Sequence, residues 1–200
     1  RLVPSSSLPL VTLYLSLFTF PSPEPAVPTA IPRPAESEYK SFYHNYISMV
    51  PEGDLLKILA DQLDDLAARM ARVPADKEQY RYAPDKWTVA EVIGHLADSE
   101  RVFAYRALRF ARKDQSPLTG FDENTWTPAS NYARRPLADV VAEFRAVRQA
   151  TLALLRGLEP EAFTRTGTAN NSPISVRALA YTIAGHERHH MQVLKERYGV

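Results

Sequence analysis

The chain has 200 residues, of which 45% are hydrophobic and 24% are charged, and its formal net charge is +1. This length and composition are typical of one soluble globular domain with a substantial core. The near-neutral charge argues against a basic nucleic-acid-binding face, and the absence of cysteine excludes disulfides, thiolate nucleophiles and cysteine-ligated zinc sites.

Residues 1–35 differ in composition from the rest of the chain. They hold eight of the sixteen prolines and an apolar run from Leu8 to Phe20. The run is too short to span a membrane, which takes about 20 apolar residues. A secretory signal, a tail and an artefact of an upstream sequence all stay open as interpretations. We expect residues 1–35 to be a proline-rich, disordered leader and residues 36–200 to be the folded domain. The expected location is cytoplasmic, with export left open by the apolar run.

Four amphipathic helices are predicted in the remaining chain. Asp54 is a suitable N-cap for the first helix, and Thr88 and Glu91 form a capping box at the start of the second. Apolar residues recur every three or four positions in each helix, whereas no segment alternates as a strand does. We therefore expect an all-α fold. The four helices are expected to cover residues 54–73, 88–112, 136–158 and 172–198.

Two further segments lack this periodicity. Aromatic residues between Glu36 and Val50 indicate a segment that packs across the domain. Residues 113–135 form a connection of unusual length for a compact domain, so we expect it to cross over or to cover a site. Because a long connection permits parallel neighbours, we predict an up-down-down-up four-helix bundle with the long connection between its second and third helices.

The fourth helix carries three of the five histidines of the chain. Its apolar face is marked by Val176, Leu179, Ile183 and Val193. The same rhythm continues through His186 and His190, which lie four residues apart and therefore on one face. His189 is expected to face a neighbouring helix or solvent.

Two imidazoles on a buried helix face need polar partners. Neutral imidazole is a common ligand of divalent metals, and the i,i+4 spacing lets both rings reach one ion. The alternative interpretation is a half-exposed pair that is hydrogen-bonded to carboxylates.

A further histidine lies in the second predicted helix. His95 is at the edge of its apolar face, a position that is by itself more typical of a core-edge histidine bonded to a neighbour. Asp98 and Ser99 follow on the next turn, where they can support a ligand or face solvent. In the third helix we expect Arg145 and Arg148 to face solvent, although either can reach an anionic substrate if the site is near.

The second and fourth helices also carry two sequence signatures. Residues 86–100 read KWTVAEVIGHLADSE and residues 184–190 read AGHERHH. Both resemble signatures of the DinB/YfiT-like superfamily, and the similarity extends over roughly residues 39–198. The resemblance implies an up-down-down-up bundle that holds a divalent metal through one histidine of the second helix and an HxxxH pair of the fourth. By position these ligands are His95, His186 and His190, with zinc or nickel as the expected metal.

The resemblance also implies a range of activities. Members with assigned activities include S-transferases that use bacillithiol, mycothiol or glutathione, and a maleylpyruvate isomerase. Many others are described as metal-dependent hydrolases or damage-inducible proteins. No motif of one subgroup is evident in this chain, and the proline-rich leader departs from the family pattern.

Three neutral imidazoles leave a coordination position open, as in catalytic zinc sites. An open position can lower the pKa of a bound water to about 7 or bind a thiol as thiolate. Because the chain has no cysteine, any thiolate must come from a cosubstrate. The leading hypothesis is a metal-dependent transferase in which the metal activates a low-molecular-weight thiol. A metal-dependent hydrolase is the second hypothesis, and a non-catalytic metal- or ligand-binding bundle is the third.

The general base and the partners are less defined by the sequence. Asp98, Glu100 and Glu187 are candidate bases, but their spacing does not rank them, and each is also typical of a solvated or supporting carboxylate. We expect a small-molecule substrate, no nucleic acid and no membrane, with a homodimer as one option.

Overall fold

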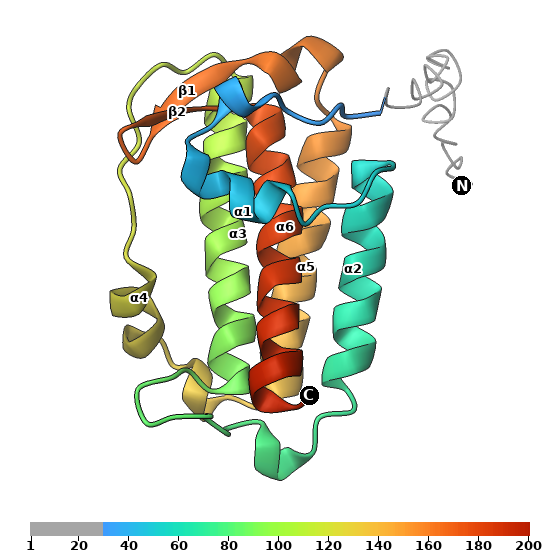
Figure 1. The fold of residues 1–200 in the computed structure, drawn as a ribbon, viewed down its shortest axis with the longest axis vertical. Coiled ribbons are helices and arrows are strands. Elements are labelled where there is room, and N and C mark those ends of the chain that lie inside the picture. Colours follow the sequence, from blue (N-terminus) through green and yellow to red (C-terminus); the bar gives the residue numbers. More distant parts are fainter. Residues whose placement is uncertain (1–29) are drawn as a thin grey trace, which may run out of the picture.

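The computed structural model describes residues 30–200. The apolar run from Leu8 to Phe20, and with it most of the predicted leader, lies outside the described residues. The described chain is mostly helical, and four long helices lie side by side (Figure 1). They are α2 (Leu55–Met70), α3 (Val89–Ala111), α5 (Leu137–Arg156) and α6 (Val176–Val193), and α6 continues into the π-helical turn η6 (Leu194–Tyr198).

Short elements join and cover the long helices. Two short α-helices are α1 (His44–Ile47) and α4 (Glu123–Ala129). The 3₁₀ turns are η1 (Glu36–Glu38), η2 (Ser41–Tyr43), η3 (Ala75–Lys77), η4 (Tyr132–Arg134) and η5 (Pro160–Thr164). Within residues 30–200, none of these helices has both the length and the apolarity that a membrane span needs.

The helix starts follow from their capping residues. Asp54 accepts a hydrogen bond from the Leu56 amide at 2.9 Å, as expected for an N-cap. Thr88 and Glu91 form the predicted capping box, in which the Glu91 amide donates to Thr88 Oγ1 at 3.0 Å and the Thr88 amide donates to Glu91 Oε2 at 2.8 Å. The fourth long helix begins later than predicted, at Val176, where Ser175 caps it.

The prediction of a chain without strands was wrong. Strands β1 (Thr166–Ala169) and β2 (Ser172–Ser175) pair in antiparallel register at one end of the bundle (Figure 1). Asn170 and Asn171 form the turn between them, with positive φ angles of 49° and 57°. Asparagine tolerates this left-handed conformation, and two such residues make the tight turn that suits a hairpin. Residues 172–175 are therefore a strand instead of the first turn of α6.

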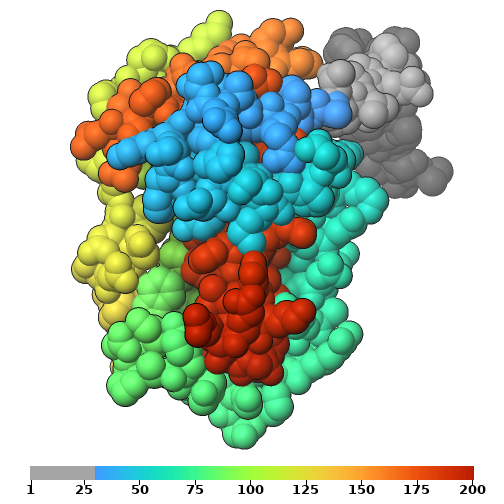
Figure 2. Space-filling model, viewed as in Figure 1, coloured from blue at the N-terminus to red at the C-terminus, as the bar shows by residue number. Residues whose placement is uncertain are grey.

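Residues 31–35, which composition assigns to the leader, make contacts with the helical bundle. Ile31 is buried, and its carbonyl accepts a hydrogen bond from the Tyr181 hydroxyl at 3.1 Å. The Arg33 guanidinium donates to the carbonyls of Ile47 and Val50 at 2.9 and 2.6 Å. This N-terminal segment lies across α6, and α1 packs against α6. Together they cover the part of α6 nearest the hairpin (Figure 2).

A glycine allows α1 to approach α6 closely. A Cβ atom at Gly185 would lie 2.0 Å from the carbonyl oxygen of Tyr46. Glycine is unfavourable inside a helix by roughly 1 kcal/mol relative to alanine, and here the contact explains its presence. The close approach brings the Tyr46 ring against the histidine-bearing part of α6.

The apolar core has two parts. One part, around Leu59, Phe103 and Ile174, lies toward the hairpin, and the other, around Ile93 and Leu194, lies toward the opposite end of the bundle. Between them buried polar side chains meet from all four long helices. The candidate site lies at this level.

Candidate metal centre

The structure brings the three predicted ligands together. His95 comes from α3, and His186 and His190 come from consecutive turns of α6. His95 Nε2 lies 3.1 Å from His186 Nε2, and His190 Nε2 also lies 3.1 Å from His186 Nε2. One ring nitrogen from each residue lies within 4.8 Å of the others, an arrangement that can hold a metal ion.

Burial keeps these imidazoles neutral. Burial, with a smaller contribution from the neighbouring His189, lowers the pKa of His95 to about 4. Burial and the neighbouring imidazoles hold the pKa values of His186 and His190 well below the usual range. The lone pairs of the rings are therefore free of protons at neutral pH, which is the state that binds metal.

The donor set itself fits a cation. In a neutral imidazole one ring nitrogen is a donor and the other an acceptor. His186 Nε2 lies next to the Nε2 atoms of both His95 and His190. Hydrogen bonds among the three atoms cannot satisfy all of them, because one nitrogen cannot donate a single proton to two neighbours. A divalent ion would accept all three lone pairs at once.

Apolar and aromatic side chains surround the cluster. The Trp87 ring lies 4.7 Å from the His95 ring, and the Tyr46 ring lies 5.3 Å from the His186 ring. Ser99 Oγ lies 3.4 Å from His95 Nδ1, so it can orient this ring. These contacts fix the rings before any ligand binds.

The cluster lies in the wall of a cavity of about 340 Å³. Besides the three ligand candidates, two of its lining residues carry charge: Glu123 from α4 and Arg106 from α3. The connection between α3 and α5 contributes Phe121, Glu123 and Asn124, so it covers the site as its length suggested. The remaining lining residues are Phe42, Tyr43, Tyr46, Trp87, Ser99, Phe103, Asn170 and His189.

The other two histidines lie apart from the cluster. His189 is half-buried at the same cavity, with its ring 5.5 Å from the Tyr46 ring, but it is outside the group of three nitrogens that converge. It thus faces a neighbouring segment, as its helical phase predicts. His44 is exposed, with Nδ1 3.7 Å from a Glu36 carboxylate oxygen.

None of the predicted general bases lines this cavity. Asp98 accepts a hydrogen bond from the Tyr132 hydroxyl at 3.0 Å and pairs with Arg101 at 3.0 Å. Glu100 and Glu187 both pair with Arg148, at 2.8 and 2.7 Å. Each of the three carboxylates therefore has a structural partner.

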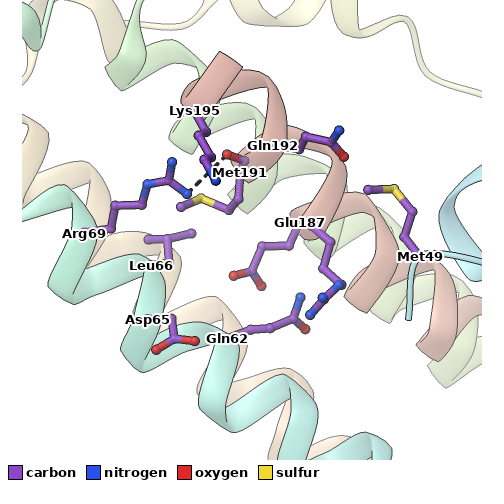
Figure 3. A pocket seen from close by; sticks show the side chains of 10 residues that line it. Met49, Gln62, Asp65, Leu66, Arg69, Glu187, Met191, Gln192 and Lys195 are labelled. Atoms are coloured by element: carbon purple, nitrogen blue, oxygen red, sulfur yellow. Dashed lines mark hydrogen bonds between the residues drawn. The ribbon is translucent and has the colours of Figure 1, made fainter. Parts of the chain in front are cut away.

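Glu187 points to the opposite side of α6. It lines a second cavity, of about 370 Å³, between α2 and α6, and Figure 3 shows its carboxylate beside Gln62 there. Burial raises the pKa of Glu187 to about 6, and Arg148 counteracts this shift. Adjacent residues of a helix point about 100° apart around its axis. Glu187 therefore does not share the cavity that His186 lines.

The expectation that Arg148 faces solvent was wrong. Its side chain is fully buried and pairs with Glu100 and Glu187. Arg145 is half-buried, with its guanidinium 3.7 Å from an Asp64 oxygen. The two arginines lie three residues apart on α5. Arg148 differs in having two buried carboxylates, those of Glu100 and Glu187, as partners.

Arg106 and Glu123 were missed as cavity residues. Arg106 has a sequence signal, since it falls in phase with Phe103, Ala107 and Phe110 on the buried face of α3. Glu123 has none, because α4 lies in a segment without apolar periodicity. Only the three-dimensional path of the connection places it at the cavity.

A sequence model of the DinB superfamily matches residues 58–194, more than half of the chain. The chain belongs to the DinB superfamily. The resemblance inferred from the helix signatures is thereby confirmed.

Three relatives of known sequence carry the same description. Two from Oceanobacillus iheyensis and one from Geobacillus kaustophilus are each called "Putative metal-dependent hydrolase". The first is 32% identical over 112 residues, which is 55% of this chain and 64% of the relative. The second is 26% identical, over 57% of this chain and 66% of the relative. The third is 25% identical, over 63% of this chain and 72% of the relative. The chain thus spans just under two thirds of the length of the first two.

A solved structure shows the same fold. YfiT from Bacillus subtilis aligns with a TM-score of 0.61 and 22% sequence identity, over 83% of this chain and 93% of YfiT. That protein is described as "a probable metal-dependent hydrolase with an unusual four-helix bundle topology". The alignment establishes a four-helix bundle for this chain, with the β1–β2 hairpin as a small addition.

Proposed function

We propose that the chain is a metal-dependent enzyme for a small-molecule substrate, with one divalent ion held by His95, His186 and His190. The observation that carries the proposal is the convergence of three neutral imidazoles in the wall of an open cavity of about 340 Å³. A structural metal is normally enclosed by four protein ligands, whereas a catalytic one keeps a position for substrate. The cavity therefore favours an enzyme over a non-catalytic bundle.

The chain's own residues supply the surroundings of the reaction. When bound, a divalent ion such as zinc or nickel supplies a Lewis acid that activates water, a thiol or a carbonyl group. Trp87 and Tyr46 shield the imidazoles from bulk water and hold their orientation. Ser99 supports His95 from the protein side.

Glu123 is our proposed general base. Among the described residues that line this cavity, it is the one carboxylate. It is half-buried at the first turn of α4 and can take a proton from a water or thiol in the cavity. With a water nucleophile the reaction is hydrolysis, which agrees with the names of the curated relatives.

Thiol transfer is the second candidate, and a neighbouring cavity favours it. A cavity of about 550 Å³ adjoins the histidine cavity and shares Arg106 and Phe121 with it. Two adjoining cavities provide room for a cosubstrate beside the substrate. Because the chain has no cysteine, such a cosubstrate would have to bring its own thiol.

The proposed site also depends on the directions of the helices, for which we propose up-down-down-up. Contacts of α2 with α6 advance in the same direction along both, from Gln62 with Ala184 to Arg69 with Met191. Contacts of α2 with α5 run in opposite directions, from Leu59 with Arg148 to Asp64 with Arg145. Contacts of α3 with α6 also run in opposite directions, from His95 with His190 to Phe103 with His186. Together these pairs support α2 and α6 running one way and α3 and α5 the other.

A substrate screen on metal-loaded protein tests the proposed function. Small esters and amides are offered with and without a low-molecular-weight thiol, before and after chelation. Turnover that needs metal but no thiol supports hydrolysis, and turnover that needs both supports thiol transfer. No turnover in any arm, with metal bound, contradicts the enzyme proposal.

The Glu123→Gln variant tests the base. We expect kcat to fall about 100-fold or more, as for loss of a general base, with metal content unchanged. Glu161→Gln is the matched control, since Glu161 is exposed and does not line the cavity. Equal activity of Glu123→Gln and wild type would remove Glu123 from the mechanism.

A further inference from the structure

Arg106 is a buried cation without an anionic partner. Its side chain is 3% exposed, yet no carboxylate of the described residues 30–200 lies within ion-pair distance of it. One hydrogen bond is formed with the chain, from Nη2 to the Thr119 carbonyl at 2.9 Å. A guanidinium has five N–H donors, so most of its binding capacity is unused. A buried charge is costly unless an anion pairs with it.

Two other arginines, the buried Arg148 and the half-buried Arg177, each have the anionic partner that Arg106 lacks. Arg148, also fully buried, has two carboxylate partners, Glu100 and Glu187. Arg177 is paired with Glu38. Burial lowers the pKa of Arg106, and the Tyr43 hydroxyl offsets this shift only in part. The contrast indicates that the counter-charge for Arg106 is not supplied by the described part of the chain.

The position of Arg106 directs it at the cavities. It lines both the histidine cavity and the adjoining one of about 550 Å³. Its guanidinium carbon lies 5.9 Å from the Phe103 ring centre and 6.0 Å from the Phe121 ring centre. The Phe103 ring in turn lies 5.9 Å from the His186 ring. One aromatic ring therefore separates the guanidinium from the histidine cluster.

We infer that Arg106 binds an oxyanion group of the substrate, a carboxylate or a phosphate, while another part of the same molecule lies at the histidine cluster. The guanidinium near these two aromatic rings carries a planar set of donors, which suits bidentate binding of an oxyanion. The inference rests on the proposed function, because it names a substrate class for the same cavity. It does not require a particular reaction.

A purely structural role for Arg106 predicts something different. In that case its contact with the Thr119 carbonyl holds the α3–α4 connection in place, and substitution lowers stability without changing ligand selectivity. Selectivity between charged and neutral ligands is therefore the readout that separates the two roles.

Calorimetric titration of the full chain, metal-loaded and metal-free, tests the inference with three probes: glutarate, inorganic phosphate and neutral glutaramide. We expect at least one anion to bind the metal-free protein and glutaramide to bind neither form. Arg106→Met should weaken anion binding by about tenfold or more, since a charged hydrogen-bonded contact is lost. Arg106→Lys should retain part of it. Arg109→Met is the matched control, because Arg109 lies one turn away, pairs with Asp114 and lines neither cavity.

The outcomes separate this inference from the proposed function. If the anion that binds is glutarate or phosphate alone, that result also identifies the oxyanion class. Anion binding that depends on Arg106 in protein that takes up no metal would support the inference and contradict the metal site. Metal uptake without anion binding, or anion binding that Arg106→Met and Arg106→Lys both leave unchanged, would overturn it. Circular dichroism of each variant verifies that the fold is retained.

Discussion

Gly185 sets the distance between α6 and the segment that carries Tyr46. Its missing side chain leaves room for the Tyr46 carbonyl, which would lie 2.0 Å from an added Cβ. The contact involves backbone on both sides, so rotation of a side chain cannot relieve it. This close approach places the Tyr46 ring against the rings of His186 and His189.

Substitution of Gly185 by alanine should therefore destabilise the protein despite the better helix propensity of alanine. We expect a loss of roughly 1–3 kcal/mol, as for an overpacked core position, and a displacement of Tyr46 from His186. Gly157→Ala is the control, because a Cβ there would meet its nearest atom at 3.4 Å. Urea denaturation of both variants provides the measurement, and a Gly185→Ala variant as stable as wild type would contradict the steric account.

The ion pair of Glu38 with Arg177 gives a stability change with a defined sign in pH. Its hydrogen bonds with Arg177 lower the pKa of Glu38 from 4.5 to about 2. Because the folded pKa lies below the unfolded one, the contribution is complete above about pH 4.5 and is lost as the pH falls toward 2. We expect Glu38→Gln to cost roughly 1 kcal/mol at pH 7, a value reduced by solvent screening.

Wild type and Glu38→Gln also test the pH dependence of this contribution. The difference in unfolding free energy between wild type and Glu38→Gln should shrink as the pH falls from 4.5 toward 2. A difference that stays constant over this range would show that the carboxylate charge is not responsible.

Helical phase accounts for what the sequence revealed about the site. His186 and His190 continue an apolar rhythm, and His189 does not, so the local pattern alone separates them. His95 and Arg106 lie on the buried face of α3, where a polar side chain needs a partner. The identity of that partner depends on which other helix lies opposite, and no local pattern contains this information.

At the scale of elements, one guanidinium joins the four long helices. Arg148 of α5 donates to the Leu59 carbonyl of α2 at 2.9 Å and pairs with Glu100 of α3 and Glu187 of α6. The three side chains carry a formal charge of −1 when both carboxylates are ionised. This cluster fixes the relative heights of the helices, and with them the heights of His95 and His186.

Removal of this guanidinium should be severely destabilising. Arg148→Met leaves two buried carboxylates without a cation, and we expect a loss of about 3–5 kcal/mol. Arg145→Met is the matched control on the same helix, where we expect about 0.5 kcal/mol or less because that arginine is only half-buried and its partner Asp64 is exposed. Chemical denaturation at pH 7 measures both. Similar losses for the two variants would contradict the role assigned to Arg148.

The hairpin and the late start of α6 show where element prediction failed. Asn170 and Asn171 carry the turn signal, but the strands beside them have only four residues each. Four residues are too few to show the alternating pattern of a strand. These segments are strands because they pair with each other, and the pairing is not visible in either segment alone. The caps at Asp54 and Thr88 were predictable because capping is a local interaction.

For the whole molecule, we propose that the folded domain includes residues 30–35. Composition placed its start at residue 36 because prolines continue to Pro34. Yet Ile31 is buried and Arg33 bonds to two carbonyls of the segment that covers α6. Proline-rich backbone needs no regular partner, so composition alone cannot tell a packed extended segment from a free one.

Two truncated chains measure the contribution of residues 30–35. A chain that begins at Glu36 should be less stable than one that begins at Ala30 by roughly 2 kcal/mol, from burial of one isoleucine and the lost hydrogen bonds. In a domain of this size the difference corresponds to about 4–8 °C in Tm. Equal melting temperatures would restore the boundary at residue 36.

The metal content of purified protein shows whether His95, His186 and His190 hold an ion. Wild type, His186→Ala, His190→Ala and His189→Ala are each loaded with zinc or nickel, desalted and analysed for bound metal. We predict about one equivalent in wild type and in His189→Ala, and loss of tight binding in the other two variants. A wild type that retains no metal, or a His189→Ala variant that loses the metal while His190→Ala keeps it, would contradict the site.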